Sequence, residues 1–461
     1  MGMVVAYEGE LTIDNCQLPI DKWRGGVGLG GALALAVGGG VRTIGGMGKM
    51  ASSRVLALRI VETLQGAGHV AYFAGGCVRD GLMGREPADF DVATSARPEQ
   101  VLAIFPRAQK VGAAFGVVLV REKQTAVEVA TFRTEGVYSD GRRPDSVTFT
   151  DAQHDAARRD FTCNGLFLDP VREQIHDFVG GREDIAAKTL RAIGDAAKRF
   201  GEDHLRLMRA VRFAAKLEFA IEPTTWAAMV RHAEKIEGIS RERIGEELRM
   251  MLEATAARRT QAVALLEASG LLEHIWPREG FATGLLTPRK VAWTVTPRLP
   301  DGMPRETVLV AMSVDMAAGA ALNWGRVGLA LQQNFTLSNQ ERDDIVWLGD
   351  RLPMLGDEGC WQRPVLKRVM ADRRFEALKA LHAATVNGVM DERLVAALTT
   401  YAAEGVAPEP LVTGQDLIKM GAAPGPKFKA WLDALYDRQL ALELRTREEG
   451  MAAAAELVRS K

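Results

Sequence analysis

The sequence predicts an α+β protein in which a mixed-sheet head precedes a long all-helical remainder. Between residues 51 and 180, short apolar stretches of strand length are interleaved with short stretches of helical periodicity. The connections between the expected strands include short ones, which favours a mixed sheet over a purely parallel one. After residue 181 the strand signal disappears, and amphipathic helical patterns continue to residue 461.

The composition excludes several classes of protein. Of the 461 residues, 47% are hydrophobic and 25% are charged, which rules out wholesale disorder, collagen and a polytopic membrane protein. Four scattered cysteines without C-x-x-C spacing make a disulfide scaffold or a structural zinc site unexpected, and they favour a reducing cytoplasm. The formal net charge is −1, so any basic surface for nucleic acid must be local.

Residues 1–50 differ in composition from the rest of the chain. A glycine-interrupted apolar run at 25–46 is shorter than the roughly 20 apolar residues that a membrane helix needs. Such a run buries too little to offset the entropy of ordering. We therefore expect a low-complexity, disordered and dispensable extension over 1–50. A signal peptide and an additional folded element are the alternatives.

The head is expected to begin with a helix over 51–66 and a buried strand over 69–74. Gly75 and Gly76 end this strand, and a short helix follows. The next strand, 89–94, has Asp89 and Asp91 two residues apart, which places both carboxylates on one face. The remaining expected elements are a helix over 98–105, strands over 115–120 and 126–133, a loop over 134–145, a helix ending at 158–160 and a strand over 163–169.

The helical remainder is expected to start with a neck over 181–260, followed by a body and tail over 261–461. Its strongest helix candidate is 198–217, where Leu205, Met208, Val211 and Ala215 form one apolar stripe. Residues 182–213 contain eight basic and five acidic side chains, a local surplus that suits contact with RNA phosphates.

Three acidic residues carry the clearest chemical signal. Asp89 and Asp91 cannot both be buried unpaired, and a divalent cation such as Mg²⁺ would relieve their repulsion. Glu128 stands in an apolar strand and is a candidate third ligand. The Gly75–Gly76 turn between a strand and a helix can let backbone N–H groups approach a phosphate. The alternatives are a solvated strand edge for the acids and an ordinary turn for the glycines.

Six motifs follow one another along the chain, and together they resemble the class II tRNA nucleotidyltransferase and poly(A) polymerase family. The motifs are YFAGGCVRD (72–80), ADFDVAT (88–94), VEVATFR (127–133), RRDFTCNGLFLD (158–169), RFGEDHLRLMRAVRF (199–213) and SRERIGEELRMML (240–252). The resemblance covers residues 51–260 closely. It extends more loosely to the C-terminus, where LVTGQDLIKMGAAPGPKFKAWL is similar to the tail of bacterial members.

The resemblance implies a nucleotidyltransferase head with a polymerase-β-like sheet and assigns roles to individual residues. As catalytic residues that hold two Mg²⁺ ions it indicates Asp89, Asp91 and Glu128. As nucleotide-binding residues it indicates Gly75, Gly76, Arg79, Asp80, Arg159, Asp160, Asp203, Arg206 and Arg209. For base selection it indicates Glu202, Asp203 and Arg206.

Asp203 and Arg206 are spaced as neighbours on one helix. One offers acceptors and the other a fork of donors, so the pair can be matched to the edge of cytosine or adenine. The alternative is an intrahelical ion pair with no role in base choice.

The resemblance implies template-independent addition of CCA, from CTP and ATP, to the 3′ end of tRNA in the cytoplasm. The tRNA would contact the body and tail, and neither a membrane nor a stable protein partner is expected. A bacterial poly(A) polymerase is one alternative, although residues 110–120 lack an arginine pair. An enzyme that adds only C or only A is another. A catalytically inactive RNA-binding protein is the alternative from a different class.

Overall fold

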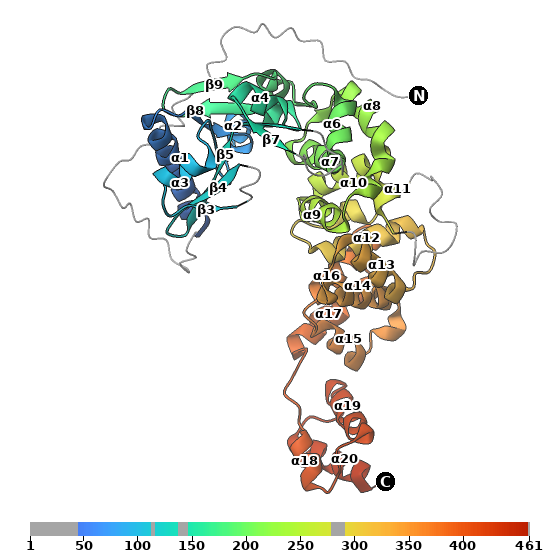
Figure 1. Ribbon diagram of the computed structural model, residues 1–461. Coiled ribbons are helices and arrows are strands. Elements are labelled where there is room, and N and C mark those ends of the chain that lie inside the picture. Colours follow the sequence, from blue (N-terminus) through green and yellow to red (C-terminus); the bar gives the residue numbers. More distant parts are fainter. Residues whose placement is uncertain (1–44, 112–115, 137–145, 278–290, 460–461) are drawn as a thin grey trace, which may run out of the picture. The chain divides into compact units, whose positions relative to one another are not determined.

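The computed structural model describes residues 45–111, 116–136, 146–277 and 291–459 (Figure 1). The chain divides into two compact units. The first unit contains the residues up to Arg206 together with Phe219–His232, and the second contains Leu207–Glu218 and the residues from Ala233 onward. The first unit is built around a β-sheet, and the second is helical.

A mixed seven-stranded sheet forms the centre of the first unit, with strand order β3-β4-β5-β2-β1-β8-β9. Its strands are β1 (Ala71–Ala74), β2 (Asp91–Thr94), β3 (Gln109–Lys110), β4 (Val117–Glu122), β5 (Thr125–Thr131), β8 (Leu166–Asp169) and β9 (Gln174–Asp177). Strands β2 and β5 are paired in parallel, and the other neighbours are antiparallel. The predicted mixed sheet is confirmed.

The two faces of this sheet differ in what covers them. On one face, α1 (Gly45–Gly66) and α3 (Pro98–Ile104) share a hydrophobic core with strand residues such as Phe73, Val92 and Val129. On the other face, α4 (Ala152–Ala157) packs in a smaller cluster with Phe132 and Phe167. Because side chains alternate along a strand, the residues next to Val92 and Val129 are directed away from the main core.

The first unit contains further short elements around the sheet. They are α2 (Gly76–Leu82), β6 (Arg133–Glu135), β7 (Val147–Phe149), the 3₁₀ turn η3 (Thr162–Asn164), α5 (Gly181–Ala186), β10 (Thr189–Leu190), α6 (Ala196–Glu202), β11 (Ala220–Ile221) and α8 (Pro223–His232). Strands β10 and β11 form a parallel pair, so the expectation that strands end at residue 181 is wrong. Two-residue strands are too short to show an alternating pattern in the sequence.

Three other expectations need correction. Helix α1 begins at Gly45, earlier than residue 51, whereas residues 1–44 of the expected extension lie outside the described residues. The expected loop over 134–145 starts inside a hairpin, because β6 and β7 are paired, and its residues 137–145 are outside the described ranges. Strand β2 begins at Asp91, so Asp89 lies in the preceding loop.

The helix expected over 198–217 is two helices, α6 and α7 (Leu205–Leu217). The break is at Asp203, which has an extended backbone (φ −137°, ψ 108°). Its carboxylate Oδ1 accepts a hydrogen bond of 3.0 Å from the backbone N–H of Leu205, at the first residue of α7. Short acidic side chains favour helix starts over helix interiors for this reason. The expected apolar stripe of α7 is buried.

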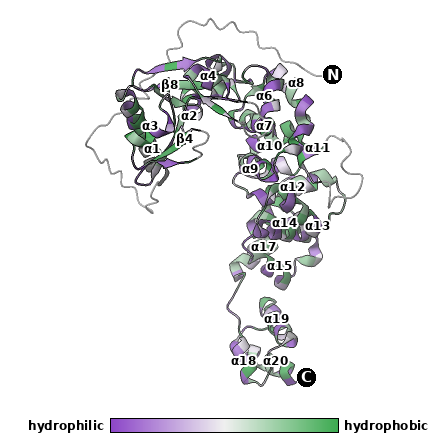
Figure 2. Ribbon diagram, viewed as in Figure 1, coloured by the Kyte–Doolittle hydropathy of each residue, from purple (hydrophilic) through white to green (hydrophobic). Residues whose placement is uncertain are grey.

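The second unit is helical over the residues that the structure describes. It includes α7 from Leu207 onward. Its other helices are α9 (Arg241–Leu252), α10 (Ala256–Ala268), α11 (Leu271–Ile275), α12 (Arg305–Ala317), α13 (Trp324–Phe335), α14 (Asn339–Arg351), α15 (Arg363–Met370), α16 (Phe375–Thr385), α17 (Glu392–Glu404), α18 (Gly414–Lys419), α19 (Pro426–Leu440) and α20 (Arg447–Arg459). Shorter 3₁₀ turns are η4 (Ala233–Gly238), η5 (Thr296–Arg298), η6 (Leu352–Gly356) and η7 (Glu358–Cys360). Hydrophobic and hydrophilic residues are mixed along many of these helices (Figure 2), as amphipathic helices require. Within the described ranges, no helix combines the length and apolar character needed to cross a bilayer.

Gly181 provides a test of the packing beside the sheet. A Cβ atom at Gly181 would lie 2.2 Å from the carbonyl oxygen of Thr162, in the turn η3. We expect Gly181→Ala to lower the free energy of unfolding by about 1–3 kcal/mol, the usual cost of overpacking. The matched control is Gly201→Ala in α6, where nothing lies within 4 Å and the change should be neutral or stabilising. Urea denaturation measures both, and equal midpoints would contradict the packing described.

Candidate active site

The pairing of β2 with β5 brings two acidic residues together. Val92 is in register with Val129, so the preceding residues Asp91 and Glu128 are neighbours across the parallel pair. Both side chains are exposed, on the face opposite the main core. Asp89 is also exposed, in the loop that leads into β2. Of the three acids that the sequence singled out, Asp91 and Glu128 are therefore neighbours in the sheet, and Asp89 is close to Asp91 along the chain.

Electrostatic crowding is visible at Asp91. Partial burial by the surrounding protein, followed by the negative charge of Glu128, raises the pKa of Asp91 to about 6. Asp89 acts in the same direction, whereas the guanidinium of Arg159 opposes it. The side chain of Asp91 still reaches solvent, so water screens part of the repulsion. Within the described ranges, no three or more His, Cys, Asp or Glu side chains are gathered closely enough to hold a metal ion.

The Gly75–Gly76 turn begins directly beside these acids, because Ala74 at the end of β1 is in register with Asp91. Gly75 has a positive φ of 70°, a conformation that favours glycine. A Cβ atom there would also lie 2.9 Å from Nη1 of Arg159. The N–H of Gly75 donates to the carbonyl of Leu166 at 3.0 Å, so this donor is already used within the sheet.

Arg79 and Asp80 follow the turn in α2. The side chain of Arg79 bonds to other residues of the protein. Its guanidinium is 3% exposed and donates to Oδ1 of Asn164 at 2.5 Å and to Oδ1 of Asp80 at 2.8 Å. These bonds connect the glycine turn to η3. Asn164 was missed by sequence reasoning, although it lies in the RRDFTCNG motif.

Arg159 lies between the glycine turn and α4. It donates from Nε and Nη2 to Oδ2 of Asp155 and from Nη1 to the carbonyl of Asn164, and its guanidinium stands 4.9 Å from the ring centre of Phe167. Asp160 is 7% exposed, and its Oδ1 accepts from the N–H of Phe161 and from Nδ2 of Asn164. Arg159 therefore links α4 to η3, while Asp160 shapes η3.

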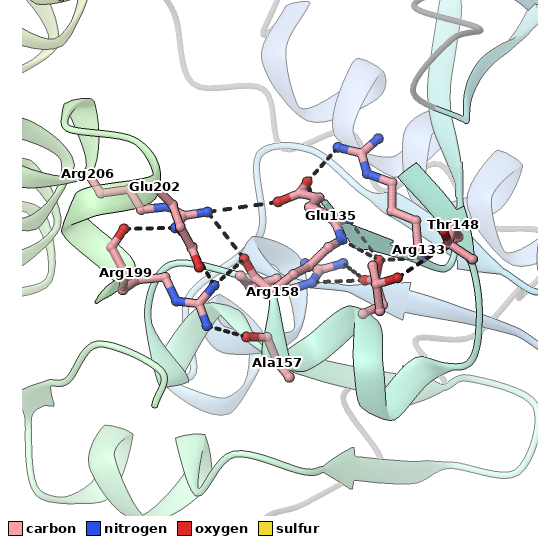
Figure 3. A network of polar contacts seen from close by, with 11 residues as sticks. Arg133, Glu135, Thr148, Ala157, Arg158, Arg199, Glu202 and Arg206 are labelled. Atoms are coloured by element: carbon pink, nitrogen blue, oxygen red, sulfur yellow. Dashed lines mark hydrogen bonds and ion pairs between the residues drawn. The ribbon is translucent and has the colours of Figure 1, made fainter. Parts of the chain in front are cut away.

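A second polar network surrounds Arg206 (Figure 3). Nη1 of Arg206 donates to Oε2 of Glu202 at 2.6 Å and to the carbonyl of Arg199 at 3.0 Å, and Nη2 donates to the carbonyl of Arg158 at 3.3 Å. Glu135 of β6 approaches Arg206 at 4.0 Å and pairs with Arg158 at 2.8 Å. Arg199 pairs with Glu202 at 2.9 Å. The network connects β6, the end of α4, α6 and the first turn of α7.

The structure changes the geometry expected for base selection. Asp203 is not on the same helix as Arg206, so the argument from helical spacing is wrong, because the chain leaves the helical conformation at Asp203. The two residues are still adjacent, since the N–H of Arg206 donates to the carbonyl of Asp203 at 3.0 Å. The ion pair of Arg206 is made with Glu202, the last residue of α6, and so it joins the two helices. Arg209 belongs to the second unit, where it stacks on Phe213 and lies 3.8 Å from Glu247.

Two protein-family models and a solved structure match this chain. Residues 71–191 match the family described as "Poly A polymerase head domain", and residues 218–278 match "Probable RNA and SrmB- binding site of polymerase A". The structure of the Bacillus stearothermophilus CCA-adding enzyme in complex with CTP superposes with a TM-score of 0.71 and 32% identity, over 88% of this chain and 97% of that one. The chain belongs to the class II tRNA nucleotidyltransferase and poly(A) polymerase family.

Curated members of this family match over a little less than half of the chain. The CCA-adding enzyme of Geobacillus stearothermophilus is 47% identical over 220 residues, which are 48% of this chain and 54% of that relative. The CCA-adding enzyme of Streptococcus suis is 50% identical over 188 residues, 41% of this chain and 46% of that relative. The matched segments thus span about half the length of these curated relatives.

The raised pKa of Asp91 predicts a pH-dependent stability. In the folded chain this pKa is about 6, whereas an unfolded aspartate titrates near pH 3.9. The folded state therefore binds the extra proton between these values, and stability is lost as the pH rises from about 4 to about 7. The Asp91→Asn side chain does not ionise, so in the presence of a chelator this variant should gain stability relative to wild type over that range. Urea denaturation across the range measures the difference, and a difference that is constant with pH would contradict the shift.

Proposed function

We propose that this protein adds CCA to the 3′ ends of tRNA, taking the nucleotides from CTP and ATP. The observation that carries the proposal is the adjacency of Asp91 and Glu128 beside the Gly75 turn, with Arg159 next to both. The similarity to CCA-adding enzymes over nearly the full length of one solved structure supports it.

In this reaction the terminal 3′-hydroxyl oxygen of the RNA bonds to the α-phosphorus of the nucleotide, and the bond from that phosphorus to pyrophosphate breaks. The absence of a side chain at Gly75 leaves room for the guanidinium of Arg159, which would contact the triphosphate beside the turn. Asp89, Asp91 and Glu128 would orient the attacking hydroxyl and the α-phosphate. Gly76, Arg79, Asp80 and Asp160 would shape the nucleotide-binding turn.

The acid set fits Mg²⁺ as the cofactor. Carboxylate oxygens are the ligands that Mg²⁺ prefers, and the crowding at Asp91 is the repulsion that such a cation relieves. Asp89, Asp91 and Glu128 would hold two ions, which would activate the hydroxyl and neutralise charge on the leaving pyrophosphate.

Base selection is assigned to Asp203 and Arg206, with Glu202 as the residue that orients the arginine. The 2.6 Å bond to Glu202 and the bonds to two backbone carbonyls fix the guanidinium of Arg206 in position. A fixed fork of donors can discriminate the edge of one base from another. Arg209 would contribute positive charge for the nucleotide or the RNA.

The remaining assignments concern the partner and the compartment. The tRNA would contact the second unit, including residues 261–461, and no stable protein partner is invoked. The free, buried Cys77 and Cys163 suit a reducing cytoplasm. A poly(A) polymerase, an enzyme adding only C or only A, and an inactive RNA-binding protein are the competing functions. The intact acid pair speaks against the inactive protein.

One assay separates these functions. Purified protein is incubated with a tRNA transcript that lacks CCA, with CTP alone, ATP alone and both, and the product ends are sequenced. The proposal predicts two C additions with CTP alone and a complete CCA with both nucleotides. Long A tracts, arrest after C, or no addition would each select one of the competing functions.

The carboxylates should be essential for activity. Asp91→Ala or Asp89→Ala should reduce nucleotide addition by several orders of magnitude, because each removes charge needed at the reacting phosphate. The matched control is Glu122→Ala, which removes an exposed carboxylate of the same sheet that pairs with Arg59 and should leave turnover unchanged. Near-normal turnover of Asp91→Ala, with a native circular dichroism spectrum, would refute the assignment.

Base choice should depend on Arg206 separately from stability. Arg206→Ala should relax selection among CTP, ATP, UTP and GTP by about tenfold to a hundredfold, since an unpaired polar edge costs roughly 1–3 kcal/mol. Arg199→Ala is the matched control, because Arg199 donates to the same Glu202 and to neighbouring carbonyls. It should lower the melting temperature similarly but retain the nucleotide ranking. Single-turnover incorporation of each nucleotide, beside thermal melts, measures both variants. The same ranking in both would show that Arg206 acts only in the ion-pair network.

A further inference from the structure

The register of the head sheet aligns the acids with an aromatic cluster at its far edge. Glu128 on β5 neighbours Asp91 on β2, and Asp91 is paired with Ala74 on β1. Ala74 is paired with Phe167 on β8, and Phe167 with His176 on the edge strand β9. The row therefore runs from the carboxylates to His176 across five adjacent strands.

The side chains at the far end of this row gather into one group of rings. The ring of Tyr72 lies 4.6 Å from that of His176 and 6.3 Å from that of Phe167. The rings of His176 and Phe178 are stacked, with an interplanar angle of 13° and centroids 6.3 Å apart. Phe178 is 42% exposed, and Tyr72 and His176 are partly exposed. We call Tyr72, His176 and Phe178 the aromatic platform.

The platform lies on the same face of the sheet as the acids. Tyr72 and Ala74 alternate with Phe73, which belongs to the main core, and Phe167 alternates with Leu168, which also does. The guanidinium of Arg159 stands 4.9 Å from the ring centre of Phe167. The positive charge of Arg159 therefore lies between the rings and the glycine turn, where it would favour the phosphates of an RNA strand.

Exposed rings on a sheet, next to arginine, form the kind of surface on which unpaired bases stack. Adjacent strands are about 4.8 Å apart, so the three steps from Asp91 to His176 cover about 14 Å. Helix α4 packs against Ala74 and Phe167 in this row, so a few nucleotides of extended single-stranded RNA would pass beside α4 to reach the rings. The RNA end that reacts at the acids would bring its preceding bases over the rings.

We propose that the aromatic platform stacks the unpaired bases that precede the reacting 3′ terminus of the RNA substrate. This proposal rests on the proposed function, and it specifies where the active site would hold the RNA, its second substrate. Tyr72, His176 and Phe178 are positioning residues: they hold the RNA and touch no reacting atom.

The test compares four full-length variants with the wild type. Phe178→Ala and Phe178→Leu remove the ring, and Phe178→Leu keeps much of its apolar surface. Phe178→Tyr retains the ring, and Val171→Ala removes an exposed apolar side chain, 49% exposed, from the turn between β8 and β9. We measure kcat and the KM values for tRNA and for CTP, together with the affinity for a short single-stranded oligoribonucleotide.

Loss of stacking should raise the KM for tRNA and the Kd for the oligoribonucleotide about tenfold in Phe178→Ala and Phe178→Leu. The kcat and the KM for CTP should stay unchanged, and Phe178→Tyr and Val171→Ala should behave as wild type. An oligoribonucleotide with abasic sites at the two positions before its 3′ end should bind wild type and Phe178→Ala equally.

Two outcomes would overturn the proposal. Recovery of RNA affinity by Phe178→Leu would show that the rings only fill space at the sheet edge. A change in the KM for CTP alone would show that they contact the incoming nucleotide instead. The two proposals fail separately: a wild type that binds the oligoribonucleotide through Phe178 but adds no nucleotide would refute only the proposed function.

Discussion

The parallel pairing of β2 with β5 is the constraint on which the rest of the site depends. It places Asp91 beside Glu128 on one face while Val92 and Val129 fill the core on the other. Burying two valines thus forces two carboxylates into proximity, and burial, followed by the negative charge of Glu128, raises the pKa of Asp91. A bound divalent cation would compensate the negative charge of these carboxylates and that of an incoming triphosphate.

Arginines extend this arrangement to the residues assigned to base selection. Arg159 links α4 to η3 through Asp155 and the carbonyl of Asn164. The neighbouring Arg158 pairs with Glu135 of β6, and its carbonyl accepts from Arg206. Buried ion pairs often contribute little net stability, because desolvation offsets the attraction, but removing one partner is costly. Here their effect is to hold guanidinium groups in fixed positions. The proposed aromatic platform lies on the same face of the sheet as the acids, so one set of strands would position both substrates.

Local patterns predicted the parts of the fold that local interactions determine. The strand around Val127 and Val129, the glycine turn and the apolar stripe of α7 all follow from side-chain periodicity. The break at Asp203 could not be predicted from helical periodicity, because it depends on a carboxylate that caps the next helix. Strands β10 and β11 depend on a partner distant in the sequence. For the same reason the partners of the site arginines, such as Asn164 and Glu135, were not recognised. The sequence motifs predicted the site residues, but only the folded structure shows which residues they bond to.

The most direct test of the central claim is the effect of Mg²⁺ on stability at pH 8, measured by the melting temperature. A cation held by Asp89, Asp91 and Glu128 binds the folded chain and relieves the repulsion at Asp91, so it should raise the melting temperature of the wild type with increasing concentration. The Asp91→Asn variant should start from a higher melting temperature in chelator and show little further response. An equal Mg²⁺ response in the two proteins would contradict the claim that these carboxylates form the metal-dependent catalytic centre.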